Sequence, residues 1–392
     1  MATSLTPAVA AKIASDVYKL NDDDELDILR KDSSEMREKK FGIFGNFTLD
    51  SVDANRFTGS SGANFWRVKS SFGYMAKGSS RSRPNELLIA IRGTDTLADV
   101  VTDLCQSMRL GPSNYPVHAG FKTTFDSFQP TLQQFLSQQS NVVAAHVVGH
   151  SLGGALATIV ADHLAGMKIH TKLYTFGCPR VGEFGFSHSL TKRLGSQNIY
   201  RVHHTADPIS MIPLFPFCHL PFDDGGFLLP YGAFVSGDAH RMKTYMASVG
   251  ATAWDGLRRK VPHPGMDAPA WLAQAATNGS GIKMYSAQVL WMITTCLHWI
   301  LKQIASVVVG SCALGVATVL DTLARTLTLG VLASVEISGY VRKLMIAILK
   351  FLGRSAQATT NFTSSFIRYV LDLLFRFLAT AAAGALQLMD QG

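Results

Sequence analysis

Cysteine is scarce in this chain, and its few cysteines are spaced too widely to form a metal or redox pair. Wide spacing and an odd count exclude the C-x-x-C motifs of zinc and disulfide-exchange sites. We therefore expect free thiols, in a chain that folds under reducing conditions. No group of histidines and carboxylates has ligand spacing either, so we expect no metal and no other cofactor. The five cysteines are Cys105, Cys178, Cys218, Cys296 and Cys312.

The first residues lack the features of a signal for general secretion. Residues 1–20 contain no basic stretch followed by a continuous apolar core, and such a signal requires both parts. We therefore expect a protein that is made in the cytoplasm. It would then associate with a membrane or be exported by a route other than Sec.

Charge is sparse and unbalanced in sign. Charged residues make up 16% of the 392 residues and hydrophobic residues 47%, and the formal net charge is +8. A basic balance suits nucleic acid or an anionic membrane. Because no nucleic-acid-binding motif is present, we expect a membrane surface as partner and no nucleic acid. The length indicates more than one domain.

The apolar excess is concentrated after residue 283. Residues 284–301 and 303–320 are two nearly uncharged stretches separated by Lys302, and each would span ~27 Å as a helix, close to the ~30 Å of a bilayer core. A basic amphipathic helix is expected at 341–352, and nine Lys/Arg against four Asp/Glu leave +5 over 283–392. We expect a domain at 1–282 and an all-helical hydrophobic region at 283–392. This region either engages a membrane, which the uncharged stretches favour, or forms a soluble bundle that covers the first domain.

Apolar strand-like runs alternate with helix-like segments in the first domain. Such alternation predicts an α/β fold with a mostly parallel sheet and helices on both faces. The first domain ends near a polar linker at 276–281. We expect strands at 65–76, 87–92, 142–148, 172–177 and 198–203, and helices at 120–139 and 152–167.

The pentapeptide GHSLG at 149–153 stands between an expected strand and an expected helix. This is the setting of a nucleophile elbow, a tight turn that lifts a serine hydroxyl above the edge of a sheet. Glycines are needed there because side chains would collide with the neighbouring strand and helix. We therefore predict that Ser151 is a nucleophile, whereas His150 is expected to point away from it.

A serine nucleophile needs a base, and the base needs an orienting carboxylate. Asp207 follows the last expected strand, and site residues collect at the carboxyl ends of strands in open α/β sheets. Among the later histidines, His240 opens a helix-like segment and is the first choice. His263, between two prolines, and His219, in a Pro- and Phe-rich loop, are the alternatives.

Four local motifs resemble those of the class 3 lipases, the fungal-type triacylglycerol lipases and their bacterial relatives. The resemblance covers residues 60–250 and implies an α/β-hydrolase fold. It also implies that Ser151 is the nucleophile, Asp207 the orienting acid and His240 the base. Thr94 and the backbone N–H of Leu152 would form the oxyanion hole. The motifs are IRGT at 91–94, VHAGF at 117–121, GHSLGG at 149–154 and TFGCPRVG at 175–182.

The segment after Thr94 departs from the family pattern. Class 3 lipases carry a short amphipathic lid there, but residues 95–103 contain only Leu97, Val100 and Val101 as an apolar stripe, with no aromatic side chain. The resemblance therefore implies only a weak lid.

Some polar residues near the motifs are expected to be structural. Arg92 and Arg180 are expected to bind buried carbonyls or carboxylates, and His118, His203 and His204 are expected to support the site without taking part in chemistry.

The expected activity is hydrolysis of glycerolipid esters through an acyl-enzyme. Phospholipid is the first substrate choice, because the basic apolar tail would bring the enzyme to an anionic membrane, and triacylglycerol is the alternative. The architecture also resembles lipase effectors delivered by bacterial type VI secretion, which would imply a cognate immunity protein. A hypothesis of another class is a membrane-perturbing helical toxin with a vestigial hydrolase fold.

Overall fold

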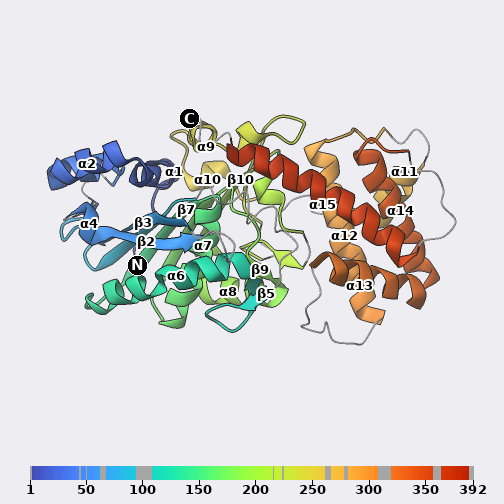
Figure 1. The fold of residues 1–392 in the computed structure, drawn as a ribbon, viewed down its shortest axis with the longest axis horizontal. Coiled ribbons are helices and arrows are strands. Elements are labelled where there is room, and N and C mark those ends of the chain that lie inside the picture. Colours follow the sequence, from blue (N-terminus) through green and yellow to red (C-terminus); the bar gives the residue numbers. More distant parts are fainter. Residues whose placement is uncertain are drawn as a thin grey trace.

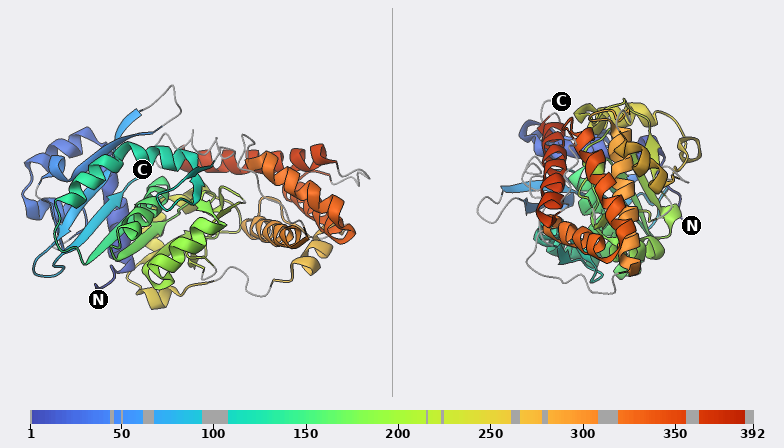
Figure 2. Two further views of the ribbon diagram at one scale, coloured as in Figure 1. Left: turned by 90° about the horizontal axis from the view of Figure 1, so that it is seen from below. Right: turned by 90° about the vertical axis from the view of Figure 1, so that its right-hand side faces the viewer.

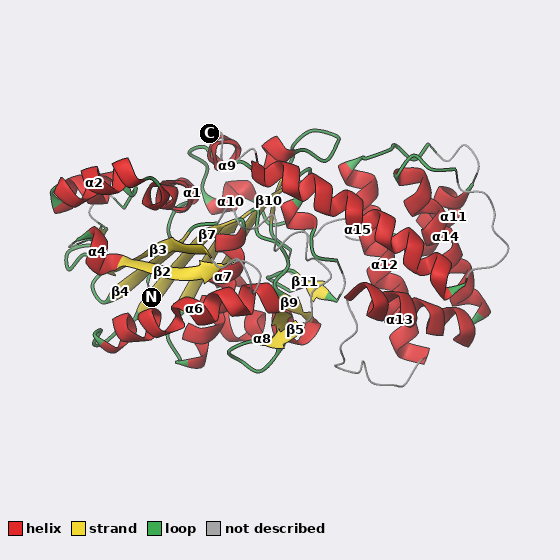
Figure 3. Cartoon of the chain, viewed as in Figure 1, coloured by secondary structure: helices red, strands yellow, loops and turns green. Residues whose placement is uncertain are grey.

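A mostly parallel β-sheet forms the centre of the amino-terminal part of the chain (Figures 1 and 3). The computed structural model describes residues 2–43, 46–49, 51–61, 68–93, 108–214, 216–222, 225–260, 266–277, 281–307, 319–355 and 363–387. The strand order is β1-β3-β4-β7-β8-β10-β12, with β2 paired to β3. The strands are β1 Phe47–Thr48, β2 Arg56–Ser61, β3 Val68–Gly78, β4 Glu86–Ile91, β7 Ala144–His150, β8 Thr171–Phe176, β10 Ile199–His204 and β12 Phe227–Leu229.

The five strands from β4 to β12 run parallel, and β1, β2 and β3 join them in antiparallel pairs. This confirms the α/β fold predicted from the alternating pattern. A small antiparallel sheet, in the order β11-β9-β6-β5, lies beside the main one. Its strands are β5 Met108–Leu110, β6 Pro116–His118, β9 Gly182–Glu183 and β11 Phe217–Cys218.

Both faces of the main sheet are covered by helices (Figure 1). Helices α6 (Ala119–Ser137) and α7 (Leu152–Gly166) cover one face, and α1 (Pro7–Asp16) with α9 (Met242–Val249) covers the other. Alternate residues of a strand point to opposite faces. Leu87, Ile89 and Ile91 of β4 accordingly enter the first core, and Leu88 and Ala90 enter the second. Burial on both faces explains why these strands read as continuous apolar runs.

The carboxyl-terminal helices form a bundle beside the sheet (Figures 1 and 2). Helix α14 packs on α11, α12, α13 and α15. Helix α11 therefore belongs to the bundle, although it precedes the boundary expected at residue 283. The bundle helices are α11 Ala268–Ala276, α12 Ala287–Val307, α13 Val319–Ala333, α14 Val335–Phe351 and α15 Ser364–Gln387.

The long helix α15 buries a stripe of apolar side chains at helical spacing. Arg368 and Arg376 lie outside that stripe and are exposed, and they pair with Asp321 and Asp372. One continuous core joins the bundle to the α6–α7 side of the sheet. The buried stripe consists of Ile367, Val370, Leu371, Leu374, Phe375, Leu378, Ala382 and Ala385.

Of the helices in the described ranges, none combines the length and the apolar character needed to cross a membrane.

Several remaining elements connect these layers. They are the 3-10 helices η1 Val17–Asn21, η2 Ser196–Asn198, η3 Ile209–Met211 and η4 Gly237–His240, and the helices α2 Asp23–Lys31, α3 Ser34–Lys40, α4 Val52–Asn55, α8 Phe184–Leu194 and α10 Trp254–Leu257.

Leu374→Ala tests whether burial of the α15 stripe stabilises the fold. Leu374 is fully buried, and truncation of such a side chain should lower the free energy of unfolding by ~2–5 kcal/mol. The matched control is Leu332→Ala in α13, because Leu332 is 78% exposed and its truncation should change that free energy by about 0.5 kcal/mol or less. Urea denaturation gives both values. Equal effects of the two substitutions would contradict the packing described for α15.

Candidate active site

Ser151 lies in the turn between β7 and α7, in a backbone conformation that residues with a side chain rarely adopt. Its φ is 57° and its ψ is −128°. Such a conformation costs ~1–3 kcal/mol and persists only where the surrounding structure enforces it. The backbone N–H of Ser151 donates to the carbonyl of Phe176 on β8 at 3.0 Å. The turn is therefore tied to the neighbouring strand.

Two glycines allow this turn to pack against its neighbours. A Cβ at Gly149 would lie 2.2 Å from the carbonyl oxygen of Gly153, and a Cβ at Gly153 would lie 2.2 Å from that of Ile91. Either contact is much shorter than any real Cβ approach, so only glycine fits. The GHSLG pattern thus reflects close backbone contact among β4, β7 and α7.

Ser151, His240 and Asp207 form a continuous hydrogen-bonded line. The distance from Ser151 Oγ to His240 Nε2 is 2.8 Å, and His240 Nδ1 lies 2.9 and 3.0 Å from the two carboxylate oxygens of Asp207. A carboxylate can only accept, so Nδ1 carries the proton that is donated to Asp207. In the neutral ring, Nε2 is then free to accept the hydroxyl proton of Ser151.

Asp207 is fully buried, and two further donors stabilise its charge. The backbone N–H of Ile209 donates to Oδ1 at 2.9 Å, and the hydroxyl of Tyr245 donates to Oδ2 at 2.6 Å. Burial, and then the negative charge of Asp207, raises the pKa of Tyr245 well above its usual value. The Tyr245 hydroxyl therefore keeps its proton and remains a donor.

The ring of His150, which was expected to point away from Ser151, packs against that of His240. Its ring centroid lies 4.6 Å from that of His240, and its Nε2 is 2.7 Å from the His240 carbonyl oxygen. Burial, and then the neighbouring His240, lowers the pKa of His150 well below its usual value. The ring is therefore neutral at pH 7. Its proton lies on Nε2 and is donated to the carbonyl, so His150 holds the backbone that carries His240.

Tyr18 of η1 connects His150 to the end of β4. The Tyr18 hydroxyl lies 2.9 Å from His150 Nδ1, to which it donates, and it accepts from the backbone N–H of Gly93 at 3.1 Å. Arg92 donates to the carbonyls of Ser71 and Gly93, which is the structural role expected for it. These bonds hold the backbone that leads into residue 94.

The residues expected for the oxyanion hole are described only in part. Leu152 is the first residue of α7, where backbone N–H groups have no partner within the helix. Thr94 and the expected lid at 95–103 lie outside the described residues.

Of the two alternative histidines, only His219 lies within the described residues, and it is not part of the hydrogen-bonded line. His263 lies outside the described residues, and His219 lines a separate cavity. His204 contacts the carbonyl of Ala239 at 2.6 Å and the hydroxyl of Ser248 at 2.9 Å, which supports η4 just before His240. Sequence reasoning missed Tyr18 and Tyr245, because no motif marks either residue.

The hydrogen-bonded line is enclosed by the rest of the chain. Ser151, Asp207 and His240 each have 0% of their surface exposed. Helix α15 contacts both η4, which ends at His240, and η3, which follows Asp207. An external molecule can therefore reach Ser151 Oγ only if part of the chain around it moves.

Tyr245→Phe tests whether the Tyr245 hydroxyl positions Asp207. The ring and its stacking on His204, at 4.1 Å between centroids, are kept. The hydroxyl loses its bond to the Asp207 carboxylate and the bond that it accepts from the backbone N–H of His204 at 3.1 Å. We expect labelling of Ser151 by a fluorophosphonate to slow by about tenfold, equivalent to ~1.4 kcal/mol. Tyr200→Phe is the control, because its hydroxyl binds Ser4, outside this network. Unchanged labelling of Tyr245→Phe would show that the hydroxyl does not position Asp207.

Known proteins match the central part of this chain. The family model described as Lipase (class 3) matches residues 88–217. The "Secreted mono- and diacylglycerol lipase 1" of Fusarium solani is 31% identical over 137 residues, which are 34% of this chain and 40% of that protein. The "Phospholipase A1 EG1, chloroplastic/mitochondrial" of Oryza sativa subsp. indica is 29% identical over 206 residues, 41% of this chain and 47% of that protein.

A crystal structure of an MDLA mutant from Penicillium cyclopium aligns with a TM-score of 0.42 and 22% identity, over 59% of this chain and 83% of that one. The chain spans less than half the length of the two curated relatives named above. The family match coincides with the segment that carries β4, the elbow and the strand before Asp207. Residues 88–217, which hold Ser151 and Asp207, are thus similar to the class 3 lipase family.

Proposed function

We propose that this chain is a serine hydrolase that cleaves carboxylic esters of glycerolipids. The single observation that carries the proposal is the line from Ser151 Oγ through His240 to Asp207, with 2.8 and 2.9 Å between the bonded atoms. This geometry lets a hydroxyl lose its proton as it attacks a carbonyl carbon. The match of residues 88–217 to class 3 lipases supports the same chemistry.

In the proposed reaction, Ser151 Oγ attacks the acyl carbonyl while His240 Nε2 takes the hydroxyl proton. The tetrahedral intermediate collapses, the bond to the glycerol oxygen breaks, and His240 returns the proton to that oxygen. Water then attacks the acyl-enzyme with His240 as base, which releases the fatty acid and restores Ser151. Asp207 stabilises the positive charge that His240 carries in both halves.

The proposed oxyanion hole consists of Thr94 and the backbone N–H of Leu152. Two donors must face the oxygen on which negative charge develops. Leu152 follows the nucleophile at the amino-terminal end of α7, where the helix dipole also favours an anion. The bonds of Arg92 and Tyr18 to Gly93 would hold the loop that leads to Thr94.

Phospholipid is the proposed substrate, in a reaction of the phospholipase A type. The net charge of +8 favours association with anionic membranes, and one relative is named as a phospholipase A1. Triacylglycerol is the alternative, and another relative is named as a mono- and diacylglycerol lipase. Fatty acid release from phospholipid vesicles, compared with release from glyceride emulsions, distinguishes these substrates.

Ser151→Ala and His240→Ala test the proposed chemistry in the full chain. Each should lower kcat by about 10,000-fold or more, and the double variant should be no slower than either single one, because the residues act as a unit. Fatty acid release from phosphatidylglycerol vesicles is the measurement. The controls are Ser137→Ala and His188→Ala, which alter exposed side chains outside the hydrogen-bonded line. Near-native turnover of Ser151→Ala would refute the proposal.

The same variant separates the enzyme from a membrane-perturbing toxin. If the helices alone perturb membranes, Ser151→Ala should release a trapped dye from vesicles as fast as the wild type. If hydrolysis causes the leakage, the release should fall together with the release of fatty acid.

We further propose that the bundle brings the enzyme to an anionic membrane surface. The junction of α13 and α14 exposes Leu329, Leu332 and Val335 by 50%, 78% and 93%. The exposed Arg325 and Arg342 stand on the same two helices. The free energies of apolar contact and of attraction to anionic lipid would then add to favour membrane binding. Export by a route other than Sec, with the immunity protein it would imply, stays a prediction.

The double substitution Leu332→Glu with Val335→Glu tests this surface. Loss of two apolar contacts, at ~1.5 kcal/mol or more each, should weaken vesicle binding by on the order of 100-fold. Co-sedimentation with phosphatidylglycerol vesicles at low salt measures the binding. The control is Val143→Glu, because Val143 is 54% exposed beside β7, outside the bundle. A wild-type protein that stays in the supernatant would refute the membrane proposal.

A further inference from the structure

A cleft separates the sheet region from helix α12 and is distinct from the candidate active site. Two adjoining cavities form it, with volumes of about 430 and 620 Å³. Among the described residues that line them, none is Ser151, Asp207 or His240. The two cavities share Arg180, Arg201, His219, Trp291 and Thr294.

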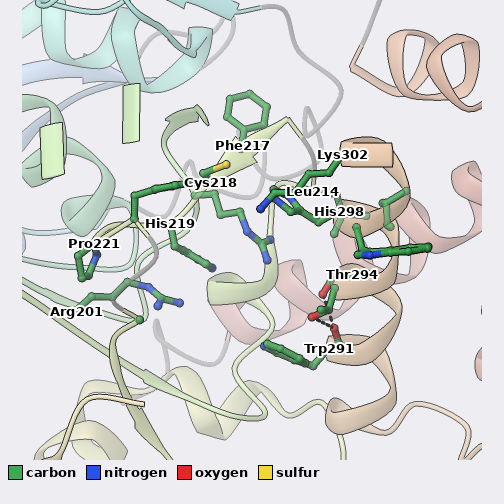
Figure 4. A pocket seen from close by; sticks show the side chains of 16 residues that line it. Arg201, Leu214, Phe217, Cys218, His219, Pro221, Trp291, Thr294, His298 and Lys302 are labelled. Atoms are coloured by element: carbon green, nitrogen blue, oxygen red, sulfur yellow. Dashed lines mark hydrogen bonds between the residues drawn. The ribbon is translucent and has the colours of Figure 1, made fainter. Parts of the chain in front are cut away.

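Basic side chains gather in this cleft from both of its walls. Figure 4 shows Arg201 and His219 on one side and His298 and Lys302 of α12 on the other. In the described part of the lining, no residue is an aspartate or a glutamate. We call this feature the cationic cleft, and its basic residues are Arg180, Arg201, His203, His204, His219, Lys283, His298 and Lys302.

Arg201 is the most unusual residue of the cationic cleft. It lies on β10 with 5% of its surface exposed, and its Nε has no hydrogen-bond partner. Within the described ranges, its guanidinium makes neither a hydrogen bond nor an ion pair. Burial, and then the charge of Arg180, lowers the pKa of Arg201 to about 9, so it is still charged at pH 7. An unpaired buried charge costs several kcal/mol.

His203 adds a second unsatisfied group beside Arg201. The two residues stand two positions apart on β10 and therefore point to the same face. His203 is 6% exposed, its Nδ1 has no partner, and its ring stacks on that of His219 at 6.4 Å. Burial, and then the charge of Arg201, lowers the pKa of both histidines well below the usual value. Each ring is therefore neutral at pH 7 and has an N–H to donate.

The nearest carboxylate does not satisfy Arg201. Asp207 acts on Arg201 only through its charge, because its oxygens already accept from His240, Tyr245 and Ile209. Arg180, by contrast, donates to the carbonyls of Met211 and Pro213, as expected for a structural arginine. The unsatisfied donors of the cleft are thus those of β10.

Large apolar side chains complete the lining. Trp291 and Thr294 of α12 face Arg201 across the pocket (Figure 4). Basic donors with apolar surface around them match a ligand that joins an anionic head to a hydrocarbon chain. The apolar residues are Leu214, Phe217, Phe222, Leu228, Leu290, Trp291, Leu297 and Trp299.

We propose that the cationic cleft binds an anionic amphiphile, with its phosphate or carboxylate head on Arg201 and His203 and its chain along Trp291. The binding goes beyond the proposed hydrolysis, because the triad does not line the cleft. A bound oxyanion would supply the partner that the Arg201 guanidinium lacks, and planar guanidinium binds such groups in a bidentate manner.

The test is calorimetric titration of the full chain with dodecyl phosphate below its micellar concentration. The protein carries Ser151→Ala, so that binding is measured without hydrolysis, and a failure of the proposed function leaves this result intact. Arg201→Gln should weaken dodecyl phosphate binding by about tenfold or more. Arg109→Gln is the matched control, because Arg109 is exposed and binds Thr123 outside the cleft. The dissociation constant of Arg109→Gln for dodecyl phosphate should equal that of the parent protein, which carries Ser151→Ala alone.

The stability of Arg201→Gln distinguishes a ligand-binding arginine from a structural one. Without ligand, its melting temperature should equal or exceed that of the parent, since an unpaired buried charge is removed. Dodecyl phosphate should raise the melting temperature of the parent only. A loss of stability without ligand, or unchanged dodecyl phosphate binding, would overturn the proposal.

Further measurements separate the contribution of the ligand's anionic head from that of its hydrocarbon chain. Trp291→Leu should weaken dodecyl phosphate binding and leave inorganic phosphate binding unchanged, which tests the contact with the hydrocarbon chain independently of Arg201. Dodecyl maltoside, which has an uncharged head, should not bind. Equal affinity for dodecyl maltoside, or for inorganic phosphate alone, would contradict an anionic amphiphile.

Discussion

The close contact of three backbone segments at Gly153 is the constraint on which the site depends. Strand β4 ends against it at Ile91, and β7 meets it through Gly149. Any side chain there would separate the strand that leads to residue 94 from the turn that carries Ser151. The nucleophile and the approach to the proposed oxyanion hole are therefore fixed by one packing contact, and the strained φ of Ser151 persists because both strands hold the turn.

Two buried charges, on Arg201 and Asp207, lie on or just after β10 and differ in how well hydrogen bonds stabilise them. Asp207 accepts from a histidine, a tyrosine and a backbone N–H, so its charge is stabilised although it has no exposed surface. Arg201, which lies on β10 itself, has a guanidinium without such partners in the described part of the chain. A buried charge that has its hydrogen-bond partners rigidifies a site. A buried charge that lacks them favours binding of a ligand that can supply them.

The bundle is part of the same core as the hydrolase region and not an appendage to it. One continuous apolar cluster includes residues of α7, η3, η4 and the bundle helices. Helix α15 contacts the two short 3-10 helices that flank Asp207 and His240. Removal of the bundle would expose apolar surface next to the triad, so experiments on the full chain report most directly on the site.

The sequence alone determined the alternation of strands and helices and the elbow at Ser151, and it predicted Asp207 and His240 as the partners that the structure brings together with Ser151. These features depend on local patterns: apolar runs, glycines at a turn and residues at the end of a strand. The contacts of Tyr18, His150 and Tyr245 and the buried position of Arg201 were decided only by the tertiary structure, because each depends on segments far apart in the chain. The placement of the carboxyl-terminal helices was decided there too. An apolar stripe must be buried, but its pattern is the same whether protein or lipid covers it.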